Sequence, residues 1–377
     1  MGAASEKLSI LLLDSSKAFD RISPPAMLHA LRRFGIPEMF IAMISAIYSD
    51  RTFCIRDGGV TSSTRQQAMG IAQGCPLSPY LFIITLTVIF EDVDALTSNR
   101  PSSVLDVSYA DDTLLSAADP SKLQEYTDTL IGVAARYGLK PNWKKTMHLR
   151  VHHSGDLFDS DRNPIRVTEQ AVYLGSLLTT SGFAFPAVAR RLGEARGAFE
   201  KIRAVWKHAN IPRARKIQIY SACVLAKLLY SLESECFRKA DISKIDAFHC
   251  RCLRVILGIP HSMTSCVSNA TVLETAGSKL LSTTVSSRQL ILFGNIAALP
   301  DSSMIRSITF DSQHVRPAPL SGKRRRGRPR LSWMSVQYAK ALKLCNHEQR
   351  VLDQYFAQRS DTEAFSWRSY VKQHPIA

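Results

Sequence analysis

Residues 104–117 read VLDVSYADDTLLSA, with two adjacent carboxylates, Asp111 and Asp112, between runs of apolar and β-branched residues. This pattern predicts a strand, a tight turn and a second strand, with the aspartates at the tip. Asp is also a favoured turn residue whose side chain bonds its own backbone, so an ordinary hairpin is the plainer interpretation. A third carboxylate, Asp14, follows the apolar run 8–13. Carboxylates that converge from separate strands are what a pair of divalent ions needs for phosphoryl transfer, and this favours a metal site.

The composition indicates a globular protein with a polyanionic partner. A chain of 377 residues with 45% hydrophobic residues is typical of packed cores in two or three domains. Its 48 Lys and Arg against 32 Asp and Glu give a net charge of +16, which favours nucleic acid first and an anionic membrane surface second. The most apolar run, residues 80–90, is too short to span a bilayer, and no secretory signal opens the chain. We therefore expect an intracellular protein without a membrane partner.

The cysteines argue against a zinc finger. Eight cysteines occur without a CxxC pair, and Cys250 and Cys252 lie only two residues apart beside His249. That spacing suits neither a zinc ribbon nor a zinc knuckle. We expect reduced thiols in the core instead.

The first half of the chain mixes predicted helices and strands. One helix is expected over 24–34 and a second from Pro37 on. Residues 51–67 are polar and β-rich around a Gly turn, which predicts a hairpin. A Gly- and Pro-rich loop over 69–79 leads into a long helix, and 121–137 is predicted to be an amphipathic helix. This order predicts an α+β layer in which helices pack behind a sheet and the three acids share its open face.

The second half is predicted to be helical. Apolar residues recur at helical spacing over 186–207, 212–237 and 241–257, between breaks that contain proline. The Arg and Lys of these helices form either a solvated face or a nucleic-acid track, and the sequence does not choose between the two. They are Arg190, Arg191, Lys201, Arg203, Lys207, Arg213, Arg215 and Lys216. Further on, KRRRGRPR at 323–330 concentrates positive charge, and we expect that stretch to be exposed and flexible.

Several motifs, taken in chain order, resemble those of the reverse transcriptases of non-LTR, LINE-type retrotransposons. LDSSKAFDRI (13–22) is similar to motif A of that family, GIAQGCPLSPYLF (70–82) to motif B, YADD (109–112) to motif C, GLKPNWKKT (138–146) to motif D and VYLGSLL (172–178) to motif E. RCLRVILGI (251–259) and the basic GRPR before Trp333 also resemble stretches that follow the polymerase in these elements. Five ordered motifs are far more specific than any one of them.

The resemblance implies an α+β polymerase palm, with an antiparallel sheet backed by helices, followed by an α-helical thumb and a basic C-terminal region. It divides the chain into a palm with motifs A to D (1–165), a primer-grip hairpin with motif E (166–182), a thumb-like domain (183–300) and a basic region (301–377). Family members carry fingers and an endonuclease before motif A. Because motif A begins so close to residue 1 here, we expect the fingers to be largely missing and the element to be truncated.

The implied activity is RNA-directed DNA polymerisation, in which deoxynucleotides are added to a primer 3′-hydroxyl. By resemblance, Asp14 and Asp111 are the principal ligands of two Mg²⁺ ions, for which Mn²⁺ could substitute, and Asp112 is a supporting ligand. Carboxylates suit Mg²⁺ because it prefers hard oxygen donors. Lys145 matches the motif D lysine, which could protonate pyrophosphate or pair with a phosphate. A solvated surface lysine is the alternative.

Other positions are implied to bind substrate. Phe19 matches a steric gate that would collide with the 2′-hydroxyl of a ribonucleotide, although a core Phe is the alternative. Gln73 and Gly74 match the pair that contacts template and incoming nucleotide, where Gly would let the backbone approach closely. Asp20 matches the motif but not a principal ligand, so we expect it to have a structural role. The remaining implied contacts are Tyr109 with substrate and Tyr173, Leu174 and Gly175 with the primer end.

The expected partners are an RNA template, a DNA primer or target and deoxynucleoside triphosphates, in a nuclear or cytoplasmic ribonucleoprotein. The alternative function is that of a catalytically inactive, nucleic-acid-binding remnant. It could include an AT-hook-like contact at 324–330, because Arg-Gly-Arg-Pro can lie extended in a narrow minor groove. The same segment could equally be a nuclear-import signal or a solvated linker. The arginines of this contact would be Arg324, Arg325, Arg326, Arg328 and Arg330.

Overall fold

The computed structural model describes residues 7–97, 104–208, 210–311, 314–319, 332–357 and 361–374. These residues form two compact units. The sheet unit runs to Leu174 and takes in Thr179–Ser181, whereas the helical unit contains Gly175–Leu178 and continues from Gly182. No described helix is long and apolar enough to cross a membrane.

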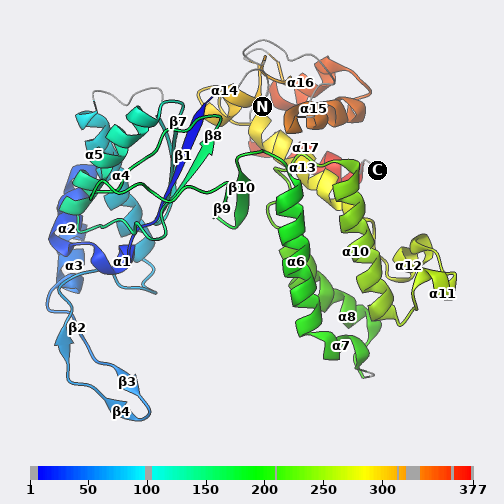
Figure 1. The fold of residues 1–377 in the computed structure, drawn as a ribbon, viewed down its shortest axis with the longest axis horizontal. Coiled ribbons are helices and arrows are strands. Elements are labelled where there is room, and N and C mark those ends of the chain that lie inside the picture. Colours follow the sequence, from blue (N-terminus) through cyan, green and yellow to red (C-terminus); the bar gives the residue numbers. More distant parts are fainter. Residues whose placement is uncertain are drawn as a thin grey trace. The chain divides into compact units, whose positions relative to one another are not determined.

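The sheet unit is built on four antiparallel strands in the order β6-β7-β1-β8 (Figure 1). The strands are β1 (Leu8–Leu13), β6 (Val104–Tyr109), β7 (Asp112–Ala117) and β8 (Met147–Val151). β6 and β7 form the predicted hairpin, in which Tyr109 pairs with Asp112 and only Ala110 and Asp111 lie between them. The hairpin prediction is therefore confirmed.

Helices cover one face of this sheet, as predicted. They are α1 (Ala18–Arg21), α2 (Pro24–Phe34), α3 (Glu38–Tyr48), α4 (Ser78–Leu96) and α5 (Pro120–Arg136). Alternate residues of the two central strands, such as Leu11 and Leu115, are fully buried in one cluster with Leu123 and Tyr126 of α5. Because side chains alternate across a strand, the residues between them point to the other face. The mixed α+β fold with an antiparallel sheet is confirmed.

A narrow two-stranded ribbon leaves the helix layer of the sheet unit between α3 and α4 (Figure 1). It consists of β2 (Thr52–Phe53) paired with β5 (Arg65–Gln66), and β3 (Arg56–Asp57) paired with β4 (Val60–Thr61). The hairpin predicted over 51–67 is thus present, and we call these residues the ribbon.

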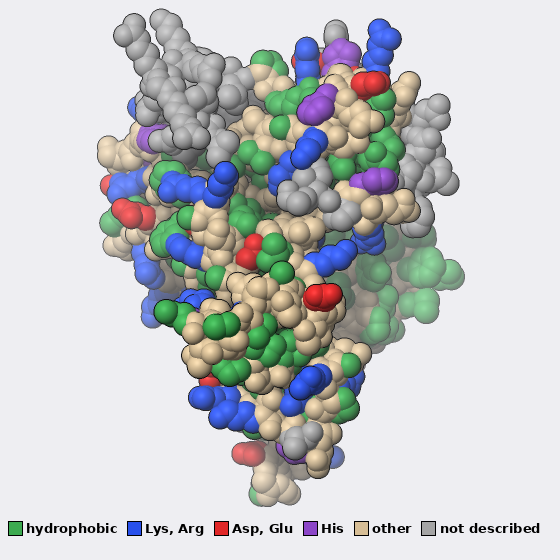
Figure 2. All heavy atoms as spheres, turned by 90° about the vertical axis from the view of Figure 1, so that its right-hand side faces the viewer, with side chains coloured by type: hydrophobic (Ala, Val, Ile, Leu, Met, Phe, Trp, Pro, Cys, Tyr) green, Lys and Arg blue, Asp and Glu red, His purple; other side chains and the backbone are tan. Residues whose placement is uncertain are grey.

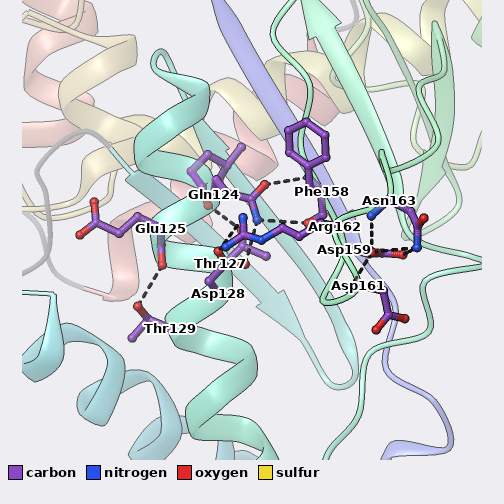
Figure 3. Close-up of polar contacts among 11 residues, drawn as sticks. Gln124, Glu125, Thr127, Asp128, Thr129, Phe158, Asp159, Asp161, Arg162 and Asn163 are labelled. Carbon is purple, nitrogen blue, oxygen red and sulfur yellow. Dashed lines mark hydrogen bonds and ion pairs between the residues drawn. The ribbon is translucent and has the colours of Figure 1, made fainter.

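The loop after β8 is fastened to α5 (Figure 3). The Phe158 N–H donates to Gln124 Oε1 at 2.7 Å, and Gln124 Nε2 donates to the Phe158 carbonyl at 3.1 Å. Asp159 Oδ1 accepts the backbone N–H of Asp161 and of Asn163, which closes the turn. This loop leads the chain from β8 towards β9 (Gln170–Tyr173), which pairs with β10 (Ser176–Thr179).

The helical unit contains two apolar clusters. The first is formed by α6 (Phe185–Lys201), α7 (Arg203–Lys207), α8 (Arg213–Tyr220), the π-helix η1 (Ser221–Leu225), α9 (Ala226–Leu228), α10 (Lys239–Leu257), α11 (Ser262–Ser265), α12 (Asn269–Thr275) and the start of α13 (Leu281–Ala297). The second joins the end of α13 to α14 (Met304–Thr309), α15 (Trp333–Leu344), α16 (Gln349–Ala357) and α17 (Asp361–Gln373).

Two expectations about this half need correction. The helix expected over 212–237 ends at Leu228, and the chain turns before α10 at Ser231, where φ is 63°. The cysteines are free, but Cys54, Cys223 and Cys266 are exposed and only Cys250, Cys252 and Cys345 are buried. Core burial therefore describes only part of the cysteine set. The basic stretch 323–330 lies outside the described residues.

Candidate catalytic site

The strand register brings Asp14 and Asp112 to the same end of the sheet. β1 pairs with β7 so that Leu13 lies opposite Thr113, and the next pair in this register is Asp14 with Asp112. Residues directly opposite each other on antiparallel strands point to the same face. Because Leu13 belongs to the core under the helices, the two carboxylates lie on the opposite face. The Asp14 side chain is 28% exposed, so solvent reaches it.

Backbone strain flanks these carboxylates. Ala110, immediately before Asp111, has φ of 53°, and Lys17, three residues after Asp14, has φ of 52°. Non-Gly residues adopt this left-handed conformation at a cost, and such residues cluster at functional sites. At Ala110 it allows a two-residue turn that presents Asp111 at its tip.

The carboxylates are close enough to influence one another's charge. Partial burial raises the pKa of Asp112, and the neighbouring Asp111 and Asp14 raise it further. Lys145 opposes this rise, and its Nζ lies 3.9 Å from Asp14 Oδ2. Like charges held together in this way are the electrostatic situation that a bound cation relieves.

The loop that carries Lys145 is joined to the segment after Asp14. The Asn142 N–H donates to the Asp14 carbonyl at 2.7 Å, and the Ser16 N–H donates to the Lys140 carbonyl at 2.9 Å. Ser15 and Pro141 form an isolated antiparallel bridge between the same two segments. Motif D is therefore positioned by backbone bonds, while the Lys145 side chain itself remains 70% exposed.

Motifs A and B are also bonded to each other. The Ile71 N–H donates to the Phe19 carbonyl at 2.6 Å, and the Gly70 N–H donates to the Ile22 carbonyl at 2.8 Å. Gln73 Nε2 donates to Asp20 Oδ1 at 2.9 Å, which gives Asp20 a contact consistent with the structural role expected of it.

A glycine that the sequence did not single out makes this junction possible. Gly70 has φ of +92°, and a Cβ there would lie 2.8 Å from the Asp20 carbonyl oxygen. Gly74, in contrast, has φ of +86° with no atom within 4 Å of its missing Cβ, so only its conformation requires glycine here. The signal for Gly70 was its place as the first residue of motif B.

The aromatic residues of motifs A and C differ in their surroundings. The Phe19 ring is partly buried and stacks on Phe82, with centroids 4.6 Å apart. It therefore contributes to the core, as the alternative interpretation expected, and this contact leaves the gate role untested. Tyr109 is exposed at the end of β6.

Tyr173 of motif E lies against the YADD hairpin. Its hydroxyl is 2.9 Å from the Val107 carbonyl oxygen and 3.4 Å from that of Asp112. Burial raises the pKa of Tyr173, and the charge of Asp112 raises it further. The sequence did not predict this anchor between motifs C and E.

The turn after Tyr173 is held from within the helical unit. Leu174 and Gly175 have φ of 48° and 76°. The Gly175 carbonyl accepts from Arg190 Nη1 at 3.0 Å and from the Arg191 guanidinium, which also lies over the Tyr230 ring at 4.7 Å.

Three of the basic residues assigned to a face or a track have structural contacts instead. Arg190 and Arg191 bind the Gly175 carbonyl, as above. The buried Lys216 donates from Nζ to the Trp206 carbonyl at 2.9 Å. Other Lys and Arg side chains are spread over the face in Figure 2, where acidic side chains are few. Arg324, Arg325, Arg326, Arg328 and Arg330 lie outside the described residues.

The donor chemistry of Asp14, Asp111 and Asp112 suits Mg²⁺, because all three offer hard carboxylate oxygens. Among the described residues, however, no three His, Cys, Asp or Glu side chains are grouped closely enough to form a metal-binding set. The metal ligands therefore remain a prediction, supported by the register and by the mutual effect of the three charges.

Comparison with known proteins adds the family. Residues 3–178 match the family "Reverse transcriptase (RNA-dependent DNA polymerase)". The chain is 27% identical over 269 residues to the RNA-directed DNA polymerase from mobile element jockey of Drosophila melanogaster, covering 67% of this chain and 28% of that protein. It is 28% identical over 268 residues to a Pol polyprotein from the type-1 retrotransposable element R2 of Popillia japonica, covering 64% of this chain and 42% of that protein. The chain thus spans less than half the length of these relatives.

Among solved structures, a telomerase from Candida tropicalis in complex with a TWJ fragment of telomeric RNA aligns with a TM-score of 0.39. The identity is 13%, over 80% of this chain and 48% of that chain.

Proposed function

Residues 3–178 are a reverse transcriptase domain of the non-LTR retrotransposon type, and from this we propose that the chain copies RNA into DNA by adding deoxynucleotides to a primer 3′-hydroxyl. One observation carries the proposal. The register sets Asp14 opposite Asp112, with Asp111 in the adjoining turn, on the sheet face away from the helices.

Asp14 and Asp111 are proposed as the principal holders of two Mg²⁺ ions, with Asp112 in support. Such a pair of ions, when bound, lowers the pKa of the attacking hydroxyl and stabilises the leaving pyrophosphate. Mn²⁺ offers the same charge and accepts the same oxygen ligands. The protein supplies the strained turn at Ala110, which keeps the carboxylates in place before substrate arrives.

Lys145 is proposed to act on the phosphates. Its Nζ lies beside Asp14 and its side chain is mostly exposed, so it can turn to a triphosphate without breaking a buried contact. An ammonium there pairs with a phosphate oxygen or gives a proton to pyrophosphate.

Gln73, Gly74, Phe19 and Tyr109 are proposed to contact nucleotide and template. The bond from Gln73 Nε2 to Asp20 leaves the Gln73 Oε1 atom to accept a hydrogen bond from substrate. The Phe19 ring, stacked on Phe82, has a fixed position from which it could exclude a 2′-hydroxyl.

We further propose the domain assignment that the family pattern implies. Residues 1–165 would be the palm, 166–182 the primer grip with Tyr173, Leu174 and Gly175, 183–300 the thumb and 301–377 a basic region. The partners would be an RNA template, a DNA primer and deoxynucleoside triphosphates. The contact of Tyr173 with the YADD hairpin supports the primer-grip role, because it ties motif E to the carboxylates.

Primer extension on an RNA template, with Mg²⁺ and deoxynucleotides, tests this function. The Asp111→Ala variant should lose at least about a hundredfold in rate, because it removes a proposed ligand at the reacting centre. Asp161→Ala is the matched control, since that exposed aspartate lies in the loop of Figure 3 and should leave the rate unchanged.

Two results would contradict the proposal. Extension that persists in Asp111→Ala would mean that the carboxylate is not needed. No extension by the folded wild-type chain, while it binds nucleic acid with salt-dependent affinity, would identify an inactive binding remnant instead.

A further inference from the structure

The ribbon, residues 51–67, exposes apolar side chains that none of the apolar cores includes. Phe53, Ile55 and Val60 are 43%, 62% and 73% exposed. None of them belongs to the three apolar clusters of the described residues. A two-stranded hairpin without a packed face is marginally stable on its own, so such a surface is suited to a partner.

The charge of the ribbon selects the class of partner. It carries Arg51, Arg56 and Arg65 against a single acid, Asp57. Neither Arg56 nor Arg65 forms an ion pair with any residue that the structure describes. An excess of unpaired arginine on an exposed strand pair complements a polyanion.

The register places an arginine beside the aromatic ring. Phe53 of β2 is directly opposite Arg65 of β5, so their side chains leave the same face of the ribbon. A flat ring next to a guanidinium group is the combination on which unpaired bases stack while the cation meets the phosphate. A duplex hides its base faces, so this pairing favours a single strand.

Arg51 fastens the base of the ribbon to motif B. Its Nη1 donates to the Gly70 carbonyl at 3.2 Å, its Nη2 donates to Gln67 Oε1 at 2.9 Å, and the guanidinium lies over the Tyr48 ring at 4.8 Å. The ribbon therefore starts from the loop that leads to Gln73 and Gly74.

We propose that the ribbon binds the unpaired part of the RNA template, with Phe53 stacking on a base and Arg56 and Arg65 contacting phosphates. This inference rests on the proposed polymerase function for the identity of the strand. It adds a template contact outside the motifs.

The affinity for a fluorescently labelled single-stranded RNA, measured by anisotropy over a range of salt concentrations, tests the contact. Phe53→Ala should weaken binding by about five- to a hundredfold with little change in salt dependence. The Arg56→Ala/Arg65→Ala double variant should lower the slope of log affinity against log salt by about 1.4.

Matched controls come from the same unit. Phe158→Ala removes another exposed ring, and Arg162→Ala/Arg166→Ala removes the same charge from exposed positions. Both should bind RNA like the wild type. Ribbon variants that bind no more weakly than these controls would overturn the proposal, as would a wild-type chain that binds no RNA.

Cys54 reports on the ribbon directly, because it is free and exposed there. RNA should slow its alkylation at least severalfold, measured by mass spectrometry, while exposed Cys266 of the helical unit serves as the reference. Burial raises the pKa of Cys252 to about 12 and of Cys345 to about 11, so these thiols should stay unmodified.

Each alkylation outcome decides between readings. Equal slowing at Cys54 and Cys266, or no slowing, contradicts the ribbon contact. Protection of Cys54 that grows with protein concentration without RNA would identify a second copy of the chain as the occupant instead. RNA protection of Cys54 without primer extension would support the ribbon contact and contradict only the polymerase function.

Discussion

At the scale of the residue, the site is a balance between like charges and the backbone that holds them together. Asp14 and Asp112 share a register position, and Asp111 follows the strained Ala110. Sequence reasoning identified all three carboxylates, because acids at strand ends and turns are visible in the pattern. It did not identify Gly70, Arg190, Arg191 or the anchor at Tyr173. Their partners are distant in sequence, and only the fold brings them together.

The raised pKa of Asp112 predicts a pH-dependent effect on stability. The folded state binds a proton at this carboxyl more readily than the unfolded chain does, so its contribution to stability falls as pH rises from the unfolded pKa through the folded one. Asp112→Asn should therefore unfold at a higher denaturant concentration than the wild type at pH 7. The gain should be less than about 1 kcal/mol, because the side chain is exposed and screened.

Urea unfolding at pH 7 and at pH 3 measures this difference. The advantage of Asp112→Asn should shrink at pH 3, where the carboxyl is protonated in both states. Asp161→Asn, a change at an exposed aspartate away from the site, should show no such dependence. An Asp112→Asn protein that is less stable than the wild type at pH 7 would show that the carboxylate is held by favourable contacts rather than by strain.

At the scale of the element, most of the sheet unit could be predicted from sequence. The YADD hairpin, the ribbon and helices α2 and α5 followed from turn residues, proline and glycine positions and helical periodicity. The helix expected to reach residue 237 ends at Leu228, although apolar residues continue beyond it. There Leu229 and Leu232 are buried in the first cluster from an irregular segment, so their burial mimics a helical pattern.

The junction between motifs A and B should depend on Gly70. Gly70→Ala places a Cβ against the Asp20 backbone at a positive φ, so we expect a loss of about 1–3 kcal/mol in the free energy of unfolding. Gly132→Ala is the matched control. Gly132 lies in α5 with open space around it, so alanine there should stabilise the protein by about 0.5–1 kcal/mol.

Denaturant unfolding followed by circular dichroism compares the two alanine variants. If Gly70→Ala is as stable as the wild type, the loop must move freely and the bonds between Phe19, Ile22 and motif B do not position the site.

At the scale of the whole molecule, the sequence indicated two regions of different character but not the cores inside the second one. The cluster around α13, α15 and α17 depends on Gly294, whose missing side chain makes room for the Trp367 ring. Trp367 Nε1 donates to the Leu290 carbonyl at 2.9 Å. A contact between residues more than seventy positions apart leaves no periodic signal, so composition indicated only a basic region there.

The net charge of +16 and the carboxylate site have complementary roles in the proposed polymerase. Distributed positive charge attracts a polyanion wherever it binds, whereas the three aspartates would create one place where metal ions can neutralise a triphosphate. Binding without the second feature would leave the chain a nucleic-acid-binding protein. The metal site is therefore the central claim.

Mn²⁺ binding to the whole chain, followed by electron paramagnetic resonance, tests that claim most directly. We expect the wild type to bind Mn²⁺ in competition with Mg²⁺, and Asp14→Asn/Asp111→Asn to bind it at least about tenfold more weakly. Asp159→Asn/Asp161→Asn, which removes two carboxylates from the loop of Figure 3, should bind like the wild type. Equal Mn²⁺ binding by the Asp14→Asn/Asp111→Asn variant and the wild type would contradict the account.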